Sequence, residues 1–210
     1  MSSPLGGVLV LDAATGAVRA HVPDSALSGD VTTGVSEVAV DARAGRVLVG
    51  LLDSLGLTDG RVLDEATGAV VAHAPALGYP MAVDETDGRV VSVIQPLSSM
   101  GGPVRANTLA TRTGTLIRSV TIGSIHTPGE AAAVAVDERT HRLFVVTQSS
   151  DGAGQGPTEL GVFDAKSGRP LSGVLLGVGP PAMAVDAQTA RVFVANTGDG
   201  TVSVLDAARL

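Results

Sequence analysis

A histidine and a glutamate stand four residues apart in the segment His-Thr-Pro-Gly-Glu, as His126 and Glu130. Imidazole nitrogen and carboxylate oxygen both bind divalent metals, so the pair has the residue types of half a metal site. Pro128 and Gly129 lie between them and exclude the helical presentation that would place both side chains on one side. We therefore keep the pair as ligand-binding candidates in a loop and assign no metal ligand.

Other polar side chains occur in segments that read as irregular connections. We expect the ligand-binding residues among them to be Tyr79, Gln148, Asp151, Asn196 and Asp199, together with His126 and Glu130. Most polar residues of these connections are expected to be solvated, and the wider set adds Asp24, Asp30, Asp53, Asp59, Gln95, Arg105 and Asn107.

Motifs of known catalytic chemistry are absent from the sequence. It contains no G-x-S-x-G, H-E-x-x-H or P-loop pattern. The glycine-rich segment 152–157 has no helix after it to present an N-terminus to phosphate, so it reads as a flexible loop. His21, His73 and His141 fall in strand or turn positions and are predicted to be edge or surface residues. We therefore predict no catalytic residue and no cofactor.

The charge and composition exclude several classes of partner. A formal charge of −7 repels a phosphate backbone and an anionic membrane surface, so neither nucleic acid nor membrane is expected as a partner. Apolar runs are far shorter than the roughly 20 residues of a membrane helix. The start of the chain has no signal-peptide pattern, and the absence of cysteine fits a cytoplasmic or an exported protein equally, so localisation stays open.

A tetrad with the pattern apolar-Ala-Val-Asp recurs four times. Its aspartates lie 43, 53 and 49 residues apart, close to the roughly 40 to 50 residues of a four-stranded propeller blade. An arginine and a strand-like apolar run follow each copy. The four copies end at Asp41, Asp84, Asp137 and Asp186, and the arginines are Arg46, Arg89, Arg142 and Arg191.

A second element alternates with the first and reads Val-Leu-Asp-Ala-Ala-Thr-Gly around Asp12. Related copies surround Asp64, Ala110, Asp164 and Asp206. The two elements predict four strands in each unit: strand A ends in the tetrad, strand B follows the arginine, strand C precedes the second aspartate, and strand D follows the turn glycine. We predict an all-β chain with one domain over residues 1–210, built from units at about 36–78, 79–130, 131–180 and 181–210, with 6–22 in addition.

The repeated aspartates and glycines have a structural interpretation. Asp at the first position of a tight turn accepts backbone N–H bonds, and Gly supplies the positive φ that closes the hairpin. We expect the repeated arginine to pair with the aspartate across the same hairpin. The repeated alanine of strand A suits an innermost strand, where only small side chains fit.

The run from Val192 to Ala207, Val-Phe-Val-Ala-Asn-Thr-Gly-Asp-Gly-Thr-Val-Ser-Val-Leu-Asp-Ala, resembles the repeat of the YVTN-type β-propellers. These are similar to NHL-like and lactonase-like propellers. The other three units keep the tetrad and the turn but have longer Gly- and Ser-rich B–C segments. The resemblance implies a β-propeller of six to eight blades, and lactonase- or lyase-type members imply His, Glu, Asn and Asp near the axis.

The repeats supply about four blades, fewer than that family uses. Three arrangements are open: a tight four-bladed ring closed by the N-terminal strands, one ring of about eight blades built from two chains, or part of a longer protein. An incomplete arc exposes flat apolar sheet faces, which favours pairing with another chain. We therefore expect a homodimer joined by blade completion.

The A–B and C–D turns share one face of such blades, and the more variable B–C and D–A connections share the other. Irregular loops on a rigid scaffold usually carry binding residues. We therefore expect a non-enzymatic scaffold that presents its B–C and D–A loops to a protein or small ligand. The alternative is a metal-assisted lyase or lactonase with its site near the propeller axis.

Overall fold

A computed structural model of the chain describes residues 6–27, 34–52, 58–94, 103–123, 129–149, 157–179 and 182–210. The described residues form seventeen β-strands and one short helix, α1 (Asp24–Leu27). The expectation of an all-β chain is confirmed, with α1 as a single turn that the strand patterns did not predict.

Four antiparallel sheets are arranged as the blades of a β-propeller, and in each the described strands neighbour one another in chain order, A-B-C-D in blades 1 to 3. Blade 1 contains β3 (Gly34–Asp41), β4 (Arg46–Leu52), β5 (Thr58–Asp64) and β6 (Val70–His73). Blade 2 contains β7 (Met81–Asp84), β8 (Arg89–Ile94), β9 (Val104–Ala110) and β10 (Leu116–Gly123). Blade 3 contains β11 (Gly129–Asp137), β12 (Arg142–Ser149), β13 (Pro157–Asp164) and β14 (Pro170–Val178). In the described residues, blade 4 has strands A to C, as β15 (Ala182–Asp186), β16 (Arg191–Asn196) and β17 (Thr201–Asp206).

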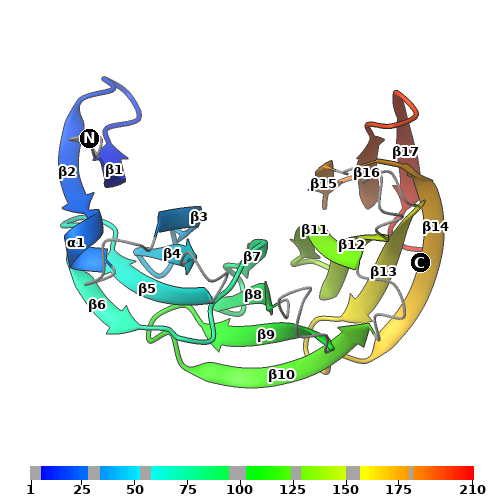
Figure 1. Cartoon of the computed structure of the whole chain (residues 1–210), viewed down its shortest axis with the longest axis horizontal. Coiled ribbons are helices and arrows are strands. Elements are labelled where there is room, and N and C mark those ends of the chain that lie inside the picture. The colour runs from blue at the N-terminus through cyan, green and yellow to red at the C-terminus, as the bar shows by residue number, and fades with distance from the viewer. Residues whose placement is uncertain are drawn as a thin grey trace.

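A separate two-stranded sheet precedes blade 1. We call it the N-terminal hairpin; it consists of β1 (Gly7–Leu11) and β2 (Val18–Pro23), which correspond to strands C and D. The N-terminal hairpin and the four blades follow one another along an open arc, with the two chain ends at opposite ends of that arc (Figure 1). Among the described strands, β2 pairs with β1 and β17 with β16, so the two ends do not complete one another within one chain.

The A–B turns have one geometry in all four blades. Each tetrad aspartate lies opposite the repeated arginine, as in Asp137↔Arg142. Asp137 accepts the N–H groups of Arg139 (2.9 Å) and Thr140 (3.3 Å) and the Thr140 hydroxyl (2.8 Å). The last turn residue has φ near +60° and is glycine in blades 1 and 2 but His141 in blade 3. The interpretation of these aspartates as turn residues is confirmed.

The repeated arginine of blade 1 pairs with a different aspartate from the one expected. Arg46 forms its ion pair with Asp64 of strand C, at 3.1 Å across β4 and β5, and not with the tetrad residue Asp41. Asp41 is fully buried and accepts the Ala44 N–H and, from blade 2, the Thr111 hydroxyl at 2.5 Å. The reason is register, because Arg46 and Asp64 are directly opposite each other in the sheet.

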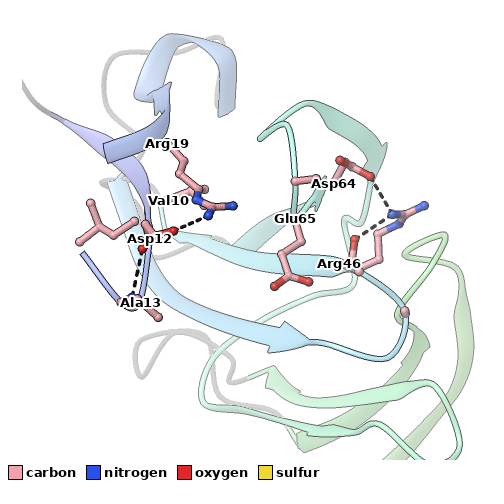
Figure 2. A pocket seen from close by; sticks show the side chains of 12 residues that line it. Val10, Asp12, Ala13, Arg19, Arg46, Asp64 and Glu65 are labelled. Atoms are coloured by element: carbon pink, nitrogen blue, oxygen red, sulfur yellow. Dashed lines mark hydrogen bonds and ion pairs between the residues drawn. The ribbon is translucent and has the colours of Figure 1, made fainter. Parts of the chain in front are cut away.

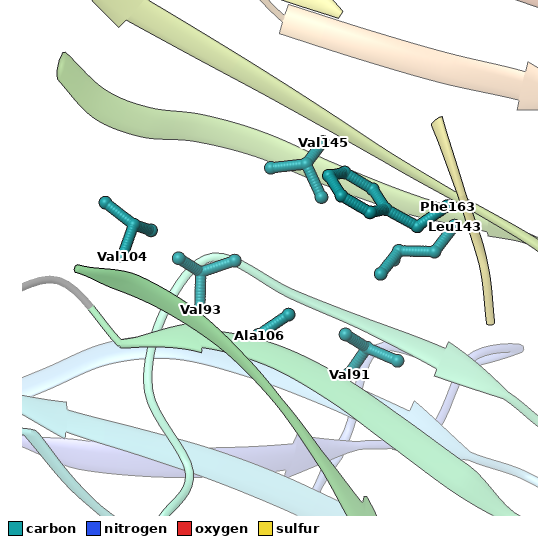
Figure 3. Packing of buried hydrophobic residues seen from close by; sticks show 7 residues of the cluster. All are labelled: Val91, Val93, Val104, Ala106, Leu143, Val145 and Phe163. Carbon is teal, nitrogen blue, oxygen red and sulfur yellow. The ribbon is translucent and has the colours of Figure 1, made fainter. Parts of the chain in front are cut away.

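Hydrophobic cores lie between successive sheets. We call the face of a blade that looks toward the next blade its leading face, and the opposite one its trailing face. Figure 3 shows the core between blades 2 and 3, where Val91 and Val93 of β8 meet Leu143, Val145 and Phe163 of blade 3. Equivalent clusters join the N-terminal hairpin to blade 1, blade 1 to blade 2, and blade 3 to blade 4. Each blade is therefore held mainly by its neighbours, which is the packing of a repeat fold.

Candidate functional site

The two faces of the arc differ in the regularity of their connections. Every A–B turn has four residues, and the C–D turns of blades 1 to 3 have five. The B–C connections range from four residues in blade 4 to nine in blade 2, and the D–A connections between blades from three to seven. The variable connections expected from the sequence therefore share one face, which we call the loop face, and the opposite face is the turn face.

Asn196 and Asp199 lie close together on the loop face, and the side chain of each forms hydrogen bonds there. The Asn196 side chain is 3% exposed and donates to the hydroxyls of Thr201 (3.1 Å) and Ser203 (2.9 Å). The Asp199 carboxylate accepts the N–H of Val178 at 2.8 Å, which ties the B–C turn of blade 4 to the end of β14. These contacts brace the loop face beside blade 4.

The other predicted binding residues come from different connections. Tyr79 is half-buried and precedes Pro80 through a cis peptide bond between β6 and β7. Gln148 in β12 lies opposite Glu130 of β11 in the sheet register. His126 and Asp151 lie outside the described residues, as does the Glu130 side chain. A common binding site for this set remains a prediction.

A charged cluster on blade 1 was only partly foreseen. Asp59 forms ion pairs with Arg61 and His73, each at 2.7 Å. Burial opposes ionisation of this carboxyl, but hydrogen bonds from Arg61, the Gly60 N–H and His73 together lower the pKa of Asp59 below its ordinary value. Sequence analysis treated Asp59 as a solvated residue and His73 as an edge residue. The cross-strand register Arg61↔His73 is what brings the three together.

One group on the turn face has the donor set of a cation site. Asp84 and Asp87 of the blade 2 turn and His141 of the blade 3 turn bring potential ligand atoms within 4.8 Å of one another. The Lys166 ammonium lies 3.7 Å from the Asp87 carboxylate and 3.1 Å from the His141 imidazole. In blades 3 and 4 a threonine occupies the position of Asp87, so this group departs from the repeat. Sequence analysis missed it because its members come from two different units.

A pocket of about 730 Å³ opens on the turn face between the N-terminal hairpin and blade 1 (Figure 2). Its walls are the C–D turn of the N-terminal hairpin and both turns of blade 1. Asp12 pairs with Arg19, and Asp64 pairs with Arg46, while the Glu65 carboxylate has no hydrogen bond or ion pair with any residue that the structure describes.

Two pocket carboxylates are held ionised by their own turns. The Thr15 side chain and N–H lower the pKa of Asp12, with a further hydrogen bond from Arg19. The Thr67 side chain and N–H do the same for the pKa of Asp64. Asp12 and Asp64 thus use their carboxylate oxygens to stabilise their own turns. Glu65 is the pocket carboxylate that forms no hydrogen bond or ion pair with a described residue.

The pocket occupies the place of a missing turn. In each blade the residue after the last residue of strand C donates its N–H to the A–B turn of the same blade, as Glu65 does to Gly45 at 3.1 Å and Ala207 to Ala190 at 2.7 Å. Ala13 is the equivalent residue of the N-terminal hairpin, in which the described residues form no strands A and B and so no A–B turn. The pocket therefore opens where the described hairpin has no A–B turn beside its C–D turn.

No helix in the described ranges is long and apolar enough to cross a membrane. No protein-family model and no curated protein matches the sequence.

Solved structures nevertheless match the fold. Hydrazine synthase of Kuenenia stuttgartiensis matches 93% of this chain and 69% of its own, with a TM-score of 0.54 and 13% identity. A hypothetical selenium-binding protein of Sulfolobus tokodaii matches 90% of this chain and 50% of its own, with a TM-score of 0.63 and 11% identity. Sqt1 of Saccharomyces cerevisiae matches 95% of this chain and 52% of its own, with a TM-score of 0.58 and 12% identity. The chain thus spans about half the length of the last two, and at these identities the comparisons establish the β-propeller fold alone.

Proposed function

We propose that this protein is a non-enzymatic binding module, in which a propeller scaffold presents its B–C and D–A connections to a protein or a small ligand. β-Propellers commonly serve as binding scaffolds. The proposal includes kinship to the YVTN-type repeat family, which residues 192–207 support.

The observation that carries this proposal is the contrast between the two faces. The turn face repeats one turn geometry, and its aspartates are engaged by their own turns, as at Asp64, Asp137 and Asp164. The loop face has connections of three to nine residues on the same scaffold. Variation confined to one face of a rigid fold is typical of a surface that recognises a ligand.

A phage-displayed library of random peptides, selected on the immobilised chain, tests the proposal. Replacing residues 95–102 or 150–156 with Gly-Ser linkers of equal length should abolish binding of the selected peptides. The paired substitutions Arg112→Ala and Thr113→Ala, on an exposed C–D turn, should leave binding unchanged. If the selected peptides lose binding only with the turn-face variant, the assignment of binding to the loop face is refuted. If no peptide is enriched, the proposal of a binding module is refuted.

A metal-assisted activity is the second candidate, and the Asp84, Asp87 and His141 group favours it. The nearby Lys166 ammonium opposes it, because a cation must displace that charge. Calorimetric titration with Zn²⁺, Mn²⁺ or Ca²⁺ gives the test. The double variant Asp87→Thr and His141→Gly restores residues that other blades use at these positions, so it should fold normally and lose any binding. An equal heat of binding for the natural chain and the double variant would exclude this group as a metal site.

A further inference from the structure

Strand β17 at one end of the arc is nearly a sequence copy of β1 at the other. Residues 8–14 read Val-Leu-Val-Leu-Asp-Ala-Ala, and residues 202–208 read Val-Ser-Val-Leu-Asp-Ala-Ala, a single difference in seven positions. Both are C strands of their sheets. A D strand that pairs with one can therefore pair with the other through the same side chains.

The two copies lie in opposite surroundings. Val8 is 7% exposed because blade 1 covers it, whereas the matching Val202 is 62% exposed and Val204 is 54% exposed. Among the described strands, none pairs as a D strand along the outer edge of β17, while β1 has one in β2. The end of blade 4 thus presents a bare leading face and an unpaired strand edge, which is a template for pairing with another chain.

At the other end of the arc, part of the trailing face of blade 1 is uncovered. Val38 and Val40 on the trailing face of β3 are 44% and 45% exposed, whereas Met81, the blade 2 equivalent of Val38, is 6% exposed. The difference arises because no A strand precedes β3 in the part of the chain that the structure describes, while β3 itself packs beside β7. The turn-face pocket is the corresponding gap at the level of the A–B turn.

We propose that a second copy of this chain fills that gap by strand exchange. In this arrangement β17 of the second copy takes the place of β1 beside β2, so that β2 becomes the D strand of the second copy's blade 4. Strands β15 and β16 of the second copy cover Val38 and Val40, and its A–B turn at residues 186–191 enters the pocket.

The balance of contacts favours the exchange. Strand β17 repeats the side chains by which β1 contacts blade 1, so the pairing with β2 is kept and the release of Val8 to solvent is offset by the burial of Val202. The net gain is the burial of the rest of the leading face of blade 4, around the half-buried Phe193, together with Val38 and Val40 of blade 1. Phe144, the blade 3 equivalent of Phe193, is fully buried because blade 4 covers it.

Two chains joined in this way form a closed ring. Each contributes three four-stranded blades and strands A to C of a fourth, which the partner's β2 completes, so the ring has eight blades. The two joints are identical and are related by a two-fold axis. The loop face stays open, so this inference is independent of the proposed binding function.

Light scattering across a range of concentrations is the first test. We expect a mass twice 20.9 kDa at tens of micromolar. A mass of 20.9 kDa at all concentrations, or a series of larger assemblies, would overturn the closed pair.

Cysteine pairs test the register, and the natural chain has no cysteine to interfere. Val10 lies opposite Ala20 in the N-terminal hairpin, so Val204 of the second copy should lie there after exchange. The double variant Ala20→Cys and Val204→Cys should therefore form a disulfide between chains upon oxidation. The matched variant Val10→Cys and Ala20→Cys should lock β1 in place, giving a monomer when oxidised and a dimer when reduced. Absence of the interchain disulfide would refute the exchange even if a dimer forms.

Point variants separate the exchanged strand from the rest of the surface. Val204→Glu should weaken association by roughly 30-fold or more, whereas Leu175→Glu, at a position 77% exposed on β14, should leave it unchanged. Glu65→Thr introduces the residue by which Thr111 contacts Asp41 of the preceding blade, and it should strengthen association because Asp186 of the second copy would receive a hydroxyl donor. Equal effects of Val204→Glu and Leu175→Glu would contradict the proposal.

Discussion

At the scale of single residues, the turn aspartates stabilise the fold through hydrogen bonds. Asp137 is fully buried and satisfies two N–H groups and one hydroxyl. Asp137→Ala should lower the free energy of unfolding by roughly 1 to 3 kcal/mol, because it leaves these donors unpaired. Asp137→Asn keeps one acceptor oxygen and should cost less. Urea titration measures both, and equal losses would show that hydrogen bonding is not the cause.

Because of similar aspartate hydrogen bonds in the C–D turns, we expect the folded state to lose stability in acid. Hydrogen bonds from Thr67 and Ser167 lower the pKa values of Asp64 and Asp164 below 3.8. The stabilisation is therefore fully present above pH 3.8 and is lost as the pH falls through the lower pKa of the folded state. The melting temperature should fall across this acid range. The double variant Thr67→Val and Ser167→Ala should show a shallower fall, and an unchanged slope would count against this account.

For Glu37 we expect the opposite dependence of stability on pH. Its half-buried carboxyl lies between blades 1 and 2, and burial raises its pKa, opposed only by the Met81 N–H at 2.9 Å. A raised pKa in the folded state means that stability is lost as the pH rises through that pKa. Glu37→Gln keeps an acceptor for Met81 and removes the charge, so it should raise the melting temperature at pH 7 but not at pH 3. A decrease at pH 7 would contradict this.

At the scale of elements, the neighbouring blades limit the size of the side chains that strand A of a blade can hold. Ala82 lies opposite Val91 on the leading face of blade 2, and β7 packs beside β11 of blade 3. Ala82→Leu should cost roughly 1 to 3 kcal/mol by overpacking this contact. Arg112→Ala on an exposed turn should change stability by about 0.5 kcal/mol or less. Denaturant titration that gave equal effects would show that β7 is not confined.

At the scale of the whole molecule, stability should decrease from the middle of the arc toward its ends. Blades 2 and 3 are covered on both faces, whereas the N-terminal hairpin and blade 4 are each covered on one. In the single chain, amide hydrogen exchange should therefore be slowest in β8 and β12 and fastest in β1 and β17. Dilution of a strand-exchanged dimer should speed exchange in β17 selectively. Uniform exchange along the arc would contradict the one-dimensional packing.

Much of the local structure could be predicted from the sequence. The tetrads and turn glycines mark strands A to D and their hairpins because strand periodicity, Asp capping and positive φ depend on residues a few positions apart. The position of the variable connections on one face also follows from that strand order. The partner of Arg46 was predicted wrongly, because the choice between Asp41 and Asp64 depends on the register between β4 and β5.

The sequence alone determined that this protein is a chain of β-propeller blades, since that depends on local pattern and its repetition. The tertiary structure decided which units touch and which faces stay uncovered. The Thr111 to Asp41 hydrogen bond, the Asp84, Asp87 and His141 group and the turn-face pocket all join different sheets. Their formation depends on how successive blades stack, and the same stacking leaves Val38 and Val204 bare at the two ends of the arc. Side chains with the same local sequence, such as Val8 and Val202, are buried or exposed only according to whether another blade lies against them.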